Sequence, residues 1–377
     1  MSTETILTFL LAMAVVPSIV DCGVRLCLAI AARSASEDVE GRPAGPCLVI
    51  VPARSEGEAV RSTLESLRSA LRAGDEAVLL LDGADPVAAR IAESLGIEVL
   101  TKEPPGPTKG AALAWLAANH RERLLSFESA MVLDTGSRLA PDFFARMRWP
   151  AGAQAVQACL TGEGGGVGEA AALSERRAQR WEDRGRVAFG WSARLRGTGM
   201  LLTPEAWLEA VPKLRTKVED WELTLLLAAA RRRIALAPAD AAVFDLKPED
   251  LDGAAAQRAR WLVGQGSLFV QHWRSLVRLV VDSPFEGTAF VTELFSRPRS
   301  LSAVFRLAVA TLLVLLDRSP AAIAFAGLIV ATVAADVALL LKGTRATRSG
   351  VLLLAAWLRA ILLLPSAFGN WLKGRHS

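Results

Sequence analysis

The sequence lacks the patterns that identify several common protein classes. Its four cysteines are scattered along the chain, with neither the spacing of a metal site nor a paired framework: Cys22, Cys27, Cys47 and Cys159. A disulfide-stapled protein is therefore excluded, and the catalytic part is expected to be cytosolic and reduced. No basic block with interleaved aromatic residues occurs, and Lys plus Arg exceed Asp plus Glu by only 43 − 39 = 4. This charge pattern argues against nucleic acid as a partner and suits an anionic membrane surface better.

Two familiar nucleotide-binding motifs are also missing. A dinucleotide-binding domain should have G-x-G-x-x-G after its first strand, but this chain has PARSEGE there, at residues 52–58. No P-loop sequence of the form G-x-x-x-x-G-K-[ST] occurs either. These two absences argue against a Rossmann dehydrogenase and against a P-loop nucleotidase.

Long apolar runs, by contrast, are present at both ends of the chain. Residues 6–31 are long enough to cross a hydrocarbon layer, which needs roughly 20 apolar residues. Asp21 and Arg25 interrupt this run but lie four residues apart, so that one helical face can pair them. A cleaved signal peptide is the alternative, but the N-terminus MSTET has no basic residue and the run is too long. We expect a retained membrane anchor over residues 1–35.

Three further apolar runs close the chain, at residues 301–316, 320–341 and 351–364. They predict a C-terminal transmembrane region over residues 301–377. The loop between the last two runs is basic, with Lys342, Arg345 and Arg348, whereas only DRSP joins the first two. The positive-inside rule then places this loop and the middle domain in the cytosol of a multi-pass inner-membrane (plasma-membrane) protein. A buried hydrophobic helical subdomain is the alternative.

Between the membrane segments, over residues 45–275, short apolar strands alternate with amphipathic helices. Strands are expected at 47–53, 77–82, 97–101 and 130–134. This alternation predicts an α/β domain with a mostly parallel sheet covered by helices on both faces. In such sheets ligands bind beyond the carboxyl ends of the strands, where Asp82 and Asp134 each end a predicted strand.

Seven motifs follow one another along this domain: VPARSEG, LLLDGAD, PTKGAAL, VLDTGS, RGTGMLL, KVEDWELTL and QRARW. In this order they resemble the membrane-embedded family 2 glycosyltransferases, a group that includes cellulose synthase and hyaluronan synthase. The resemblance covers about residues 47–270, and Q-x-x-R-W is its most specific element. It implies a GT-A fold, a nucleoside diphosphate sugar as donor, and inverting transfer to a glycan acceptor in cell-surface polysaccharide synthesis.

The resemblance assigns roles around the donor. It implies that Asp82 holds the base or ribose and that Lys109, at a helix start, lies near the diphosphate. From the sequence alone, Asp82 is equally well a turn residue before Gly83, and Lys109 an exposed lysine. Asp134 takes the first place of the family's D-x-D motif, whose carboxylates gather Mg²⁺ or Mn²⁺. The third place is Gly136, so the metal ion is expected to be weakly held.

The motif VEDWELTL predicts a helix that runs to Arg233. The resemblance makes Asp220 the general base that takes the proton of the acceptor hydroxyl, with Glu219 beside it at the acceptor. The alternative is structural, because Thr216-x-x-Glu219 also has the spacing of a capping box. The Q-x-x-R-W motif about forty residues downstream favours the catalytic role.

Gln257, Arg260 and Trp261 have the spacing i, i+3 and i+4, so that a helix presents all three on one face. The resemblance implies that Gln257 and Arg260 grip the donor diphosphate and that Trp261 supports the acceptor sugar. Arginine suits the first role because its planar guanidinium binds phosphate oxygens in pairs. An amphipathic helix at the membrane interface is the alternative.

Three segments complete the expectations. Residues 161–168 are expected to form a glycine-rich linker, residues 196–199 to face the acceptor, and residues 276–300 to form an interfacial segment. The expected partners are the nucleoside diphosphate sugar, a glycan or lipid-linked acceptor, the lipid bilayer and other polysaccharide-assembly proteins. Two other functions stay open at this point: transfer to a polyprenyl phosphate or another lipid, and a catalytically degenerate membrane scaffold, which Gly136 favours.

Overall fold

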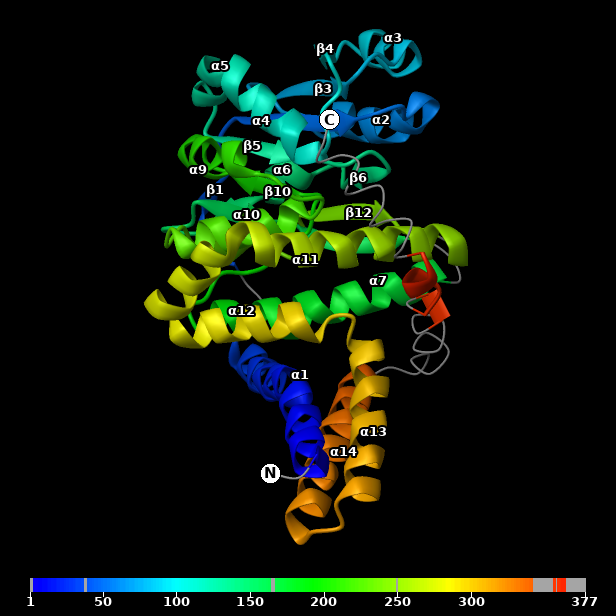
Figure 1. Cartoon of the computed structure of the whole chain (residues 1–377). Helices are drawn as coiled ribbons and strands as arrows, with labels where there is room; N and C mark the ends of the chain where they lie inside the picture. Colours follow the sequence, from blue (N-terminus) through cyan, green and yellow to red (C-terminus); the bar gives the residue numbers. More distant parts are fainter. Residues whose placement is uncertain are drawn as a thin grey trace.

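The computed structural model describes residues 3–36, 39–163, 167–248, 250–341, 355–356 and 358–363. It consists of an α/β domain, two long helices that lie across the base of this domain, and three helices that point away from it (Figure 1). This arrangement separates the region that carries the site from the region that carries the apolar runs.

A seven-stranded sheet forms the centre of the α/β domain, in the order β11-β8-β10-β5-β2-β3-β4. Its strands are β2 (Cys47–Ala53), β3 (Glu76–Asp82), β4 (Glu98–Lys102), β5 (Ser129–Val132), β8 (Ala155–Gln157), β10 (Met200–Leu202) and β11 (Ile234–Leu236). Only β10 runs antiparallel to its neighbours. The mostly parallel sheet predicted from the sequence is therefore confirmed, and the reversed β10 brings the loop before it to the carboxyl ends of β5 and β8.

Helices cover both faces of the sheet, as continuous apolar strands require. One face packs against α2 (Val60–Ala70) and α3 (Pro86–Ser94). The other face packs against α4 (Lys109–Asn119), α9 (Pro204–Ala210) and α10 (Glu219–Ala229). Both predicted aspartates lie at the carboxyl edge, although β5 ends at Val132, so that Asp134 follows the strand rather than ending it.

The predicted linker at residues 161–168 is wrong for the residues that the structure describes there. Residues 161–163 belong to β9 (Cys159–Glu163), which pairs in parallel with β12 (Ala242–Leu246). A small third strand, β6 (Ser137–Leu139), completes this second sheet. Residues 167–168 already belong to α7 (Val167–Arg177). Ladder hydrogen bonds to β12, which follows about eighty residues later, override the flexibility of the local glycines.

Helix α7 continues into the π-helical η2 (Ala178–Asp183) and α8 (Arg184–Ala188). At its far end α8 packs closely on α1 (Thr3–Ser34): a β-carbon on Gly185 would lie 2.2 Å from the backbone oxygen of Leu28. Only glycine permits this approach, so the α/β domain is fixed directly to the N-terminal helix.

Two long helices lie across the base of the domain. They are α11 (Leu251–Asp282) and α12 (Pro284–Ser296). Figure 1 shows them between the α/β domain and the remaining helices, at a large angle to α1. The segment expected to be interfacial, residues 276–300, thus contains the end of α11 and all of α12. The predicted domain boundary at residue 275 falls within α11.

Among the described residues, three helices are long and apolar enough to cross a membrane: Ile6–Ser34, Arg299–Leu316 and Pro320–Leu339. They correspond to α1, α13 (Arg299–Leu316) and α14 (Pro320–Leu341), whose apolar side chains pack together. The expected third C-terminal run, 351–364, lies mostly outside the described residues; those at 355–356 and 358–362 are helical. The basic loop at 342–350 lies wholly outside them.

Charged residues in these apolar helices pair with one another. The predicted contact between Asp21 and Arg25 is confirmed, with 3.1 Å between Nε and Oδ2. Arg25 also pairs with Asp336 of α14, which in turn pairs with Arg306 of α13. One linked set of charges therefore joins all three helices and lowers the cost of placing these groups in an apolar bundle.

A second ion-pair network joins α12 to the α/β domain. Glu293 of α12 is almost fully buried and accepts Arg186 at 2.7 Å, Arg194 at 2.5 Å and Arg297 at 2.7 Å. Burial opposes the charge on Glu293, but the surrounding arginines dominate and hold its pKa well below the usual range. Glu293 is thus the shared anion of a buried cationic cluster.

Candidate active site

Asp82 ends β3 and lies buried at the carboxyl edge of the sheet. Its Oδ1 accepts a hydrogen bond of 2.7 Å from the amide of Gly106, and Arg54 and Lys102 lie 3.6 and 3.5 Å away. The Asp82 carboxylate therefore holds the loop before α4. It does not serve the turn before Gly83, which was the alternative role for this residue. Lys102 was missed by the sequence reading, although the parallel pairing of β3 with β4 sets it opposite Asp82.

Lys109 is the centre of a second cluster. Thr108 caps α4 by accepting a hydrogen bond from the Ala111 amide, which makes Lys109 the first residue of the helix. The Lys109 ammonium lies 2.5 Å from Asp134 and 2.8 Å from Glu219, and it donates to the carbonyl oxygen of Gly197 at 2.8 Å. Three oxygen atoms, two from loops and one from the first turn of α10, thus surround one cation.

The electrostatics of this cluster follow from burial and mutual contact. Burial opposes the charge on Lys109, but Asp134 and Glu219 outweigh it and raise the pKa of the lysine above its usual range. Burial and the neighbouring Glu219 raise the pKa of Asp134 to about 6, while Lys109 opposes this shift. Lys109 therefore stays charged at neutral pH, and Asp134 is mostly ionised.

Asp220 follows Glu219 in the first turn of α10. Burial, and then the charge of Glu219, raise the pKa of Asp220 to about 7, while hydrogen bonds from the backbone of the helix start oppose the shift. Its carboxylate forms no ion pair with any residue that the structure describes. A carboxylate that titrates near neutral pH and is not tied to a cation is well suited to accept a proton.

The capping box that was the structural alternative for Thr216 and Glu219 does not form, because Glu219 pairs with Lys109. Glu222 takes its place: it is fully buried and accepts hydrogen bonds from the Thr216 amide and hydroxyl. Its other oxygen lies 2.5 Å from Nε2 of His272, where α11 departs from helical geometry. The sequence reading missed Glu222 and His272, since their contact joins residues fifty positions apart. Helix α10 ends at Ala229 rather than at the predicted Arg233.

Divalent metal is implied by the resemblance, and the described residues do not fit it. The D-x-D motif supplies Asp134 alone, and the described part of the chain holds no group of three or more His, Cys, Asp or Glu side chains that could bind a metal ion. The oxygen atoms of Asp134, Glu219 and Gly197 are already gathered around the Lys109 ammonium. The Lys109 ammonium thus lies against Asp134, the one carboxylate that the D-x-D motif would offer to a metal ion.

Gly136 explains why the motif is incomplete. Its φ is +85°, in the left-handed region that side chains rarely adopt, and its amide donates to Thr63 at 2.9 Å. We therefore expect Gly136→Asp to cost about 1 kcal/mol of stability and not to create a manganese site. Thermal unfolding, together with nucleotide titration with and without Mn²⁺, measures both effects. Gly136→Ala is the control for strain and should lose similar stability; tighter Mn²⁺-dependent nucleotide binding without loss of stability would contradict this account.

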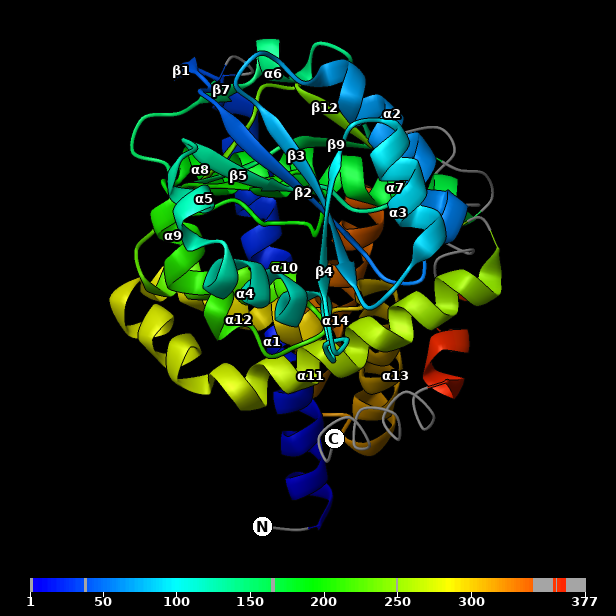
Figure 2. The same cartoon turned by 90° about the horizontal axis from the view of Figure 1, so that it is seen from above.

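Helix α11 lies along the side of the domain that carries α4 and α10 (Figure 2). A β-carbon on Gly264 would lie 2.6 Å from Val218, so α11 closely approaches the start of α10. Arg260 and Trp261 are exposed about one turn before this contact, and Gln257 is half-buried one turn earlier. The helix expected for these three residues is present, and it carries them one to two turns before its contact with the start of α10.

The loop at residues 196–199 lies beside the same cluster. Gly197 gives Lys109 its carbonyl oxygen, and the Thr198 hydroxyl accepts the Asp134 amide at 3.1 Å. Arg196, however, turns its guanidinium away, to Asp183 and Glu175. The loop thus shapes the cluster with its backbone, while its charged side chain serves a structural ion pair.

A mostly parallel sheet with this acidic and cationic cluster at its carboxyl edge defines a GT-A-type α/β domain, accompanied by three candidate transmembrane helices. The model of the family described as "Glycosyltransferase like family 2" matches residues 43–264. The chain therefore belongs to glycosyltransferase family 2 and is a glycosyltransferase built to use a nucleotide sugar. The finer resemblance to the cellulose synthase and hyaluronan synthase group remains a prediction.

Among solved structures, the chain is similar to the mannosyltransferase PcManGT from Pyrobaculum calidifontis, solved in complex with GDP-Man and Mn²⁺. The TM-score is 0.60 at 17% sequence identity, over 94% of this chain and 99% of that chain. A weaker likeness is to glucosyl-3-phosphoglycerate synthase from Mycobacterium tuberculosis with Mn²⁺, UDP and phosphoglyceric acid, at a TM-score of 0.40, 20% identity, and 65% and 81% coverage. No curated protein matches the sequence significantly. The first similarity supports the fold across nearly the whole chain.

Proposed function

We propose that this protein is an inverting glycosyltransferase that moves a sugar from a nucleoside diphosphate sugar to a hydroxyl of a membrane-associated glycan acceptor, in cell-surface polysaccharide synthesis. The observation that carries the proposal is that Asp220, a carboxylate with a raised pKa, lies beside the Lys109 ammonium, which Asp134 and Glu219 hold in place. A base and a cation side by side are what displacement of a diphosphate by a hydroxyl requires.

In the proposed reaction, Asp220 takes the proton of the acceptor hydroxyl as its oxygen attacks the anomeric carbon. The bond from this carbon to the diphosphate oxygen breaks on the opposite face, so the anomeric configuration inverts. Negative charge grows on the departing nucleoside diphosphate, and Lys109 offsets it, with Arg260 and Gln257 of α11 as further donors. Asp82 binds the nucleoside on the β3 side, and Trp261 and Glu219 border the acceptor.

The location we propose is the inner (plasma) membrane, with α1, α13 and α14 as spans and the α/β domain in the cytosol. The linked charges on the three helices support a single bundle, because unpaired charges would be costly in lipid. Helices α11 and α12, which lie across the axes of this bundle in Figure 1, then rest near the membrane surface.

A panel of nucleotide sugars tests the function directly. Membranes containing the protein should hydrolyse or transfer from one donor of the panel, and activity should remain without added Mn²⁺ because Lys109 supplies the cation. Membranes with the Asp220→Asn protein are the control for background enzymes. Absence of both turnover and nucleotide binding across the panel would overturn the proposal, and strict dependence on Mn²⁺ would overturn the role given to Lys109.

Arg260 and Trp261 should have separable effects. We expect Arg260→Ala to weaken nucleoside diphosphate binding by about tenfold, since a charge-assisted hydrogen bond is removed, and Trp261→Ala to raise mainly the KM for the acceptor. Titration calorimetry and acceptor kinetics measure the two effects. Trp273 and Arg274 provide matched controls, because they are exposed residues of the same types on the same helix. If substitution of Arg274 and Trp273 has the same effects as substitution of Arg260 and Trp261, α11 is only an interfacial helix.

A further inference from the structure

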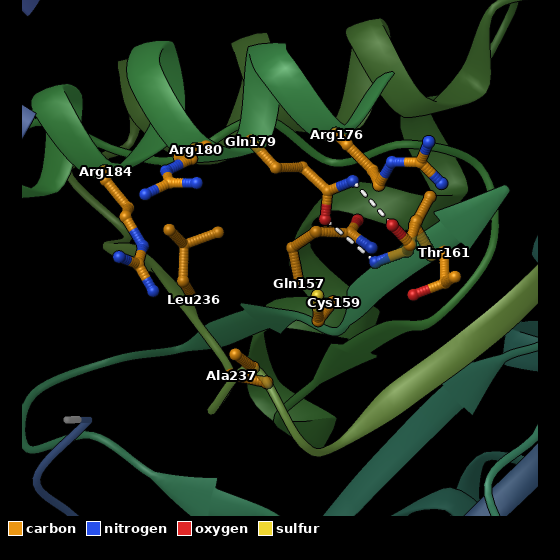
Figure 3. A pocket seen from close by; sticks show the side chains of 11 residues that line it. Gln157, Cys159, Thr161, Arg176, Gln179, Arg180, Arg184, Leu236 and Ala237 are labelled. Atoms are coloured by element: carbon orange, nitrogen blue, oxygen red, sulfur yellow. Dashed lines mark hydrogen bonds between the residues drawn. The ribbon is translucent and has the colours of Figure 1, made fainter. Parts of the chain in front are cut away.

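A cavity of about 330 Å³ lies between the helical stretch α7–η2–α8 and the carboxyl ends of β8 and β11 (Figure 3). Its lining comes from three parts of the chain. These are Gln157, Cys159, Leu160 and Thr161; Arg176, Gln179, Arg180 and Arg184; and Leu236, Ala237 and Ala239. The volume lies within the range of small-molecule sites, roughly 300–1,000 Å³. None of the residues assigned to the donor or to proton transfer lines it.

Three arginines, Arg176, Arg180 and Arg184, line this cavity from the helical stretch (Figure 3). In an α-helix a step of four residues overshoots one turn by about 40°, so arginines at this spacing would drift around the axis. The wider π-helical turns of Ala178–Asp183 rotate the chain back. The irregular segment therefore keeps all three arginines along the helical side of one cavity.

Three acidic residues of the same stretch pair with arginines outside the cavity. Glu175 lies 2.5 Å from Arg196, and Asp183 pairs with the same arginine. Glu182 lies 2.7 Å from Arg299 at the start of α13. These three carboxylates therefore pair with arginines outside the cavity and not with Arg176 or Arg180.

The remaining polar groups also suit an anion. Arg176 and Arg180 are exposed and form no ion pair with a carboxylate of the described residues. Two hydrogen bonds, of 2.8 and 3.0 Å, join the Gln179 amide to the backbone of Leu160 and hold this side chain in place at the cavity. The Thr161 hydroxyl adds a further donor at the cavity. Guanidinium groups arranged in this way bind phosphate oxygens in pairs.

One side chain connects the cavity with the catalytic cluster. Gln157 lines the cavity, its Oε1 accepts the Arg196 amide at 2.9 Å, and its Nε2 donates to the Thr198 carbonyl at 3.0 Å. Between these two residues lies Gly197, whose carbonyl accepts the Lys109 ammonium. The cavity and the cluster therefore lie on opposite sides of the same short loop.

The strand order fixes the side on which the cavity lies. Asp82 ends β3, on one side of β5, whereas β8 lies two strands from β5 on the other side. At a strand spacing of roughly 4.8 Å, this puts the end of β8 on the order of 10 Å from the end of β5. With the nucleoside on the β3 side, the cavity is on the side left for the acceptor.

We propose that this cavity binds a phosphate group carried by the acceptor, an inference that rests on the proposed glycosyltransferase function. The separation makes the phosphate an anchor rather than the attacking group, so that the attacking hydroxyl belongs to a sugar between the phosphate and Asp220. The ligand chemistry is a phosphate ester of a glycan, from a lipid-linked or a soluble source. The contact of Gly185 with Leu28 joins the helical stretch to α1 and is compatible with a lipid-borne acceptor.

The test uses the full-length protein in detergent and two probes, inorganic phosphate and farnesyl phosphate, titrated by calorimetry. The doubly substituted protein with Arg176→Ala and Arg180→Ala should bind the effective probe at least about tenfold more weakly, because charge-assisted contacts are lost. Arg68→Ala is the matched control, since Arg68 is also an exposed helical arginine but lies on α2. Thermal unfolding of each protein checks that the fold is retained.

If both probes bind the wild-type protein, and only the double substitution weakens their binding, the result supports a site for phosphate groups of either source. Binding of farnesyl phosphate alone, with the same sensitivity, supports a lipid-linked acceptor. Failure of both probes to bind, or equal binding by the double variant and the Arg68→Ala control, overturns the proposal. Donor nucleotide is titrated in the same preparation. If it does not bind the wild-type protein, the result counts against the proposed function. The phosphate titration tests the cavity independently of this result.

Discussion

Asp220→Asn should lower the rate of sugar transfer by roughly 10²–10⁴-fold, the usual contribution of a general base. The amide keeps the shape of the carboxylate but cannot take the acceptor proton. Nucleoside diphosphate binding should change little, because Lys109 and its oxygen partners remain in place. Steady-state transfer kinetics and nucleotide titration on the same preparation measure the two effects.

The pH dependence of the wild-type enzyme offers a second measurement of the same role. The base must be ionised to work, and burial beside Glu219 raises the pKa of Asp220 to about 7. Activity should therefore be full above this pKa and fall as the pH drops through it, by about tenfold per pH unit. Glu65→Gln, which removes an exposed carboxylate on α2, is the control. Activity of Asp220→Asn within a few-fold of wild type would sink the assignment.

Glu293→Gln should destabilise the protein by roughly 3–5 kcal/mol, the cost of leaving buried charge without its partner. Glu293 is 1% exposed and is the common partner of Arg186 and Arg194, which are 3% and 6% exposed. Glutamine can still accept a hydrogen bond but cannot offset two buried guanidinium charges. Thermal or urea unfolding in detergent measures the loss.

A surface ion pair supplies the control for this experiment. Glu209 and Arg232 lie 2.8 Å apart with about a third of each side chain or more exposed to solvent. Glu209→Gln should therefore cost less than about 1 kcal/mol. If Glu293→Gln unfolds no more easily than Glu209→Gln, the buried network does not hold α12 to the α/β domain.

Much of the fold could be predicted from local sequence. Apolar runs such as 47–53 and 77–82 have few structures available to them other than buried parallel strands, and the structure has β2 and β3 there. The glycine-rich stretch at 161–168 was misread because its strand forms only through pairing with β12. Local composition predicts an element well when the element is stabilised by its own pattern, and poorly when a distant partner stabilises it.

In the candidate site, too, local patterns predict single residues better than the contacts between distant residues. Lys109, Asp134 and Glu219 were each singled out from the motif order, but their convergence on one ammonium joins positions up to 110 residues apart, which no local pattern reveals. Glu222 was missed for a related reason, since a buried acid in an apolar helical run is noticed only when its partner His272 is known. The roles of Asp220, Gln257, Arg260 and Trp261 remain predictions.

Helix α1 is longer than a membrane span requires. Its 32 residues extend about 48 Å at 1.5 Å per residue, whereas a hydrocarbon layer is about 30 Å thick. In a bilayer, about 18 Å of this helix therefore extends beyond the hydrocarbon layer, and α8 packs on it at Leu28. With α1 in a bilayer, this contact fixes the distance between the α/β domain and the lipid.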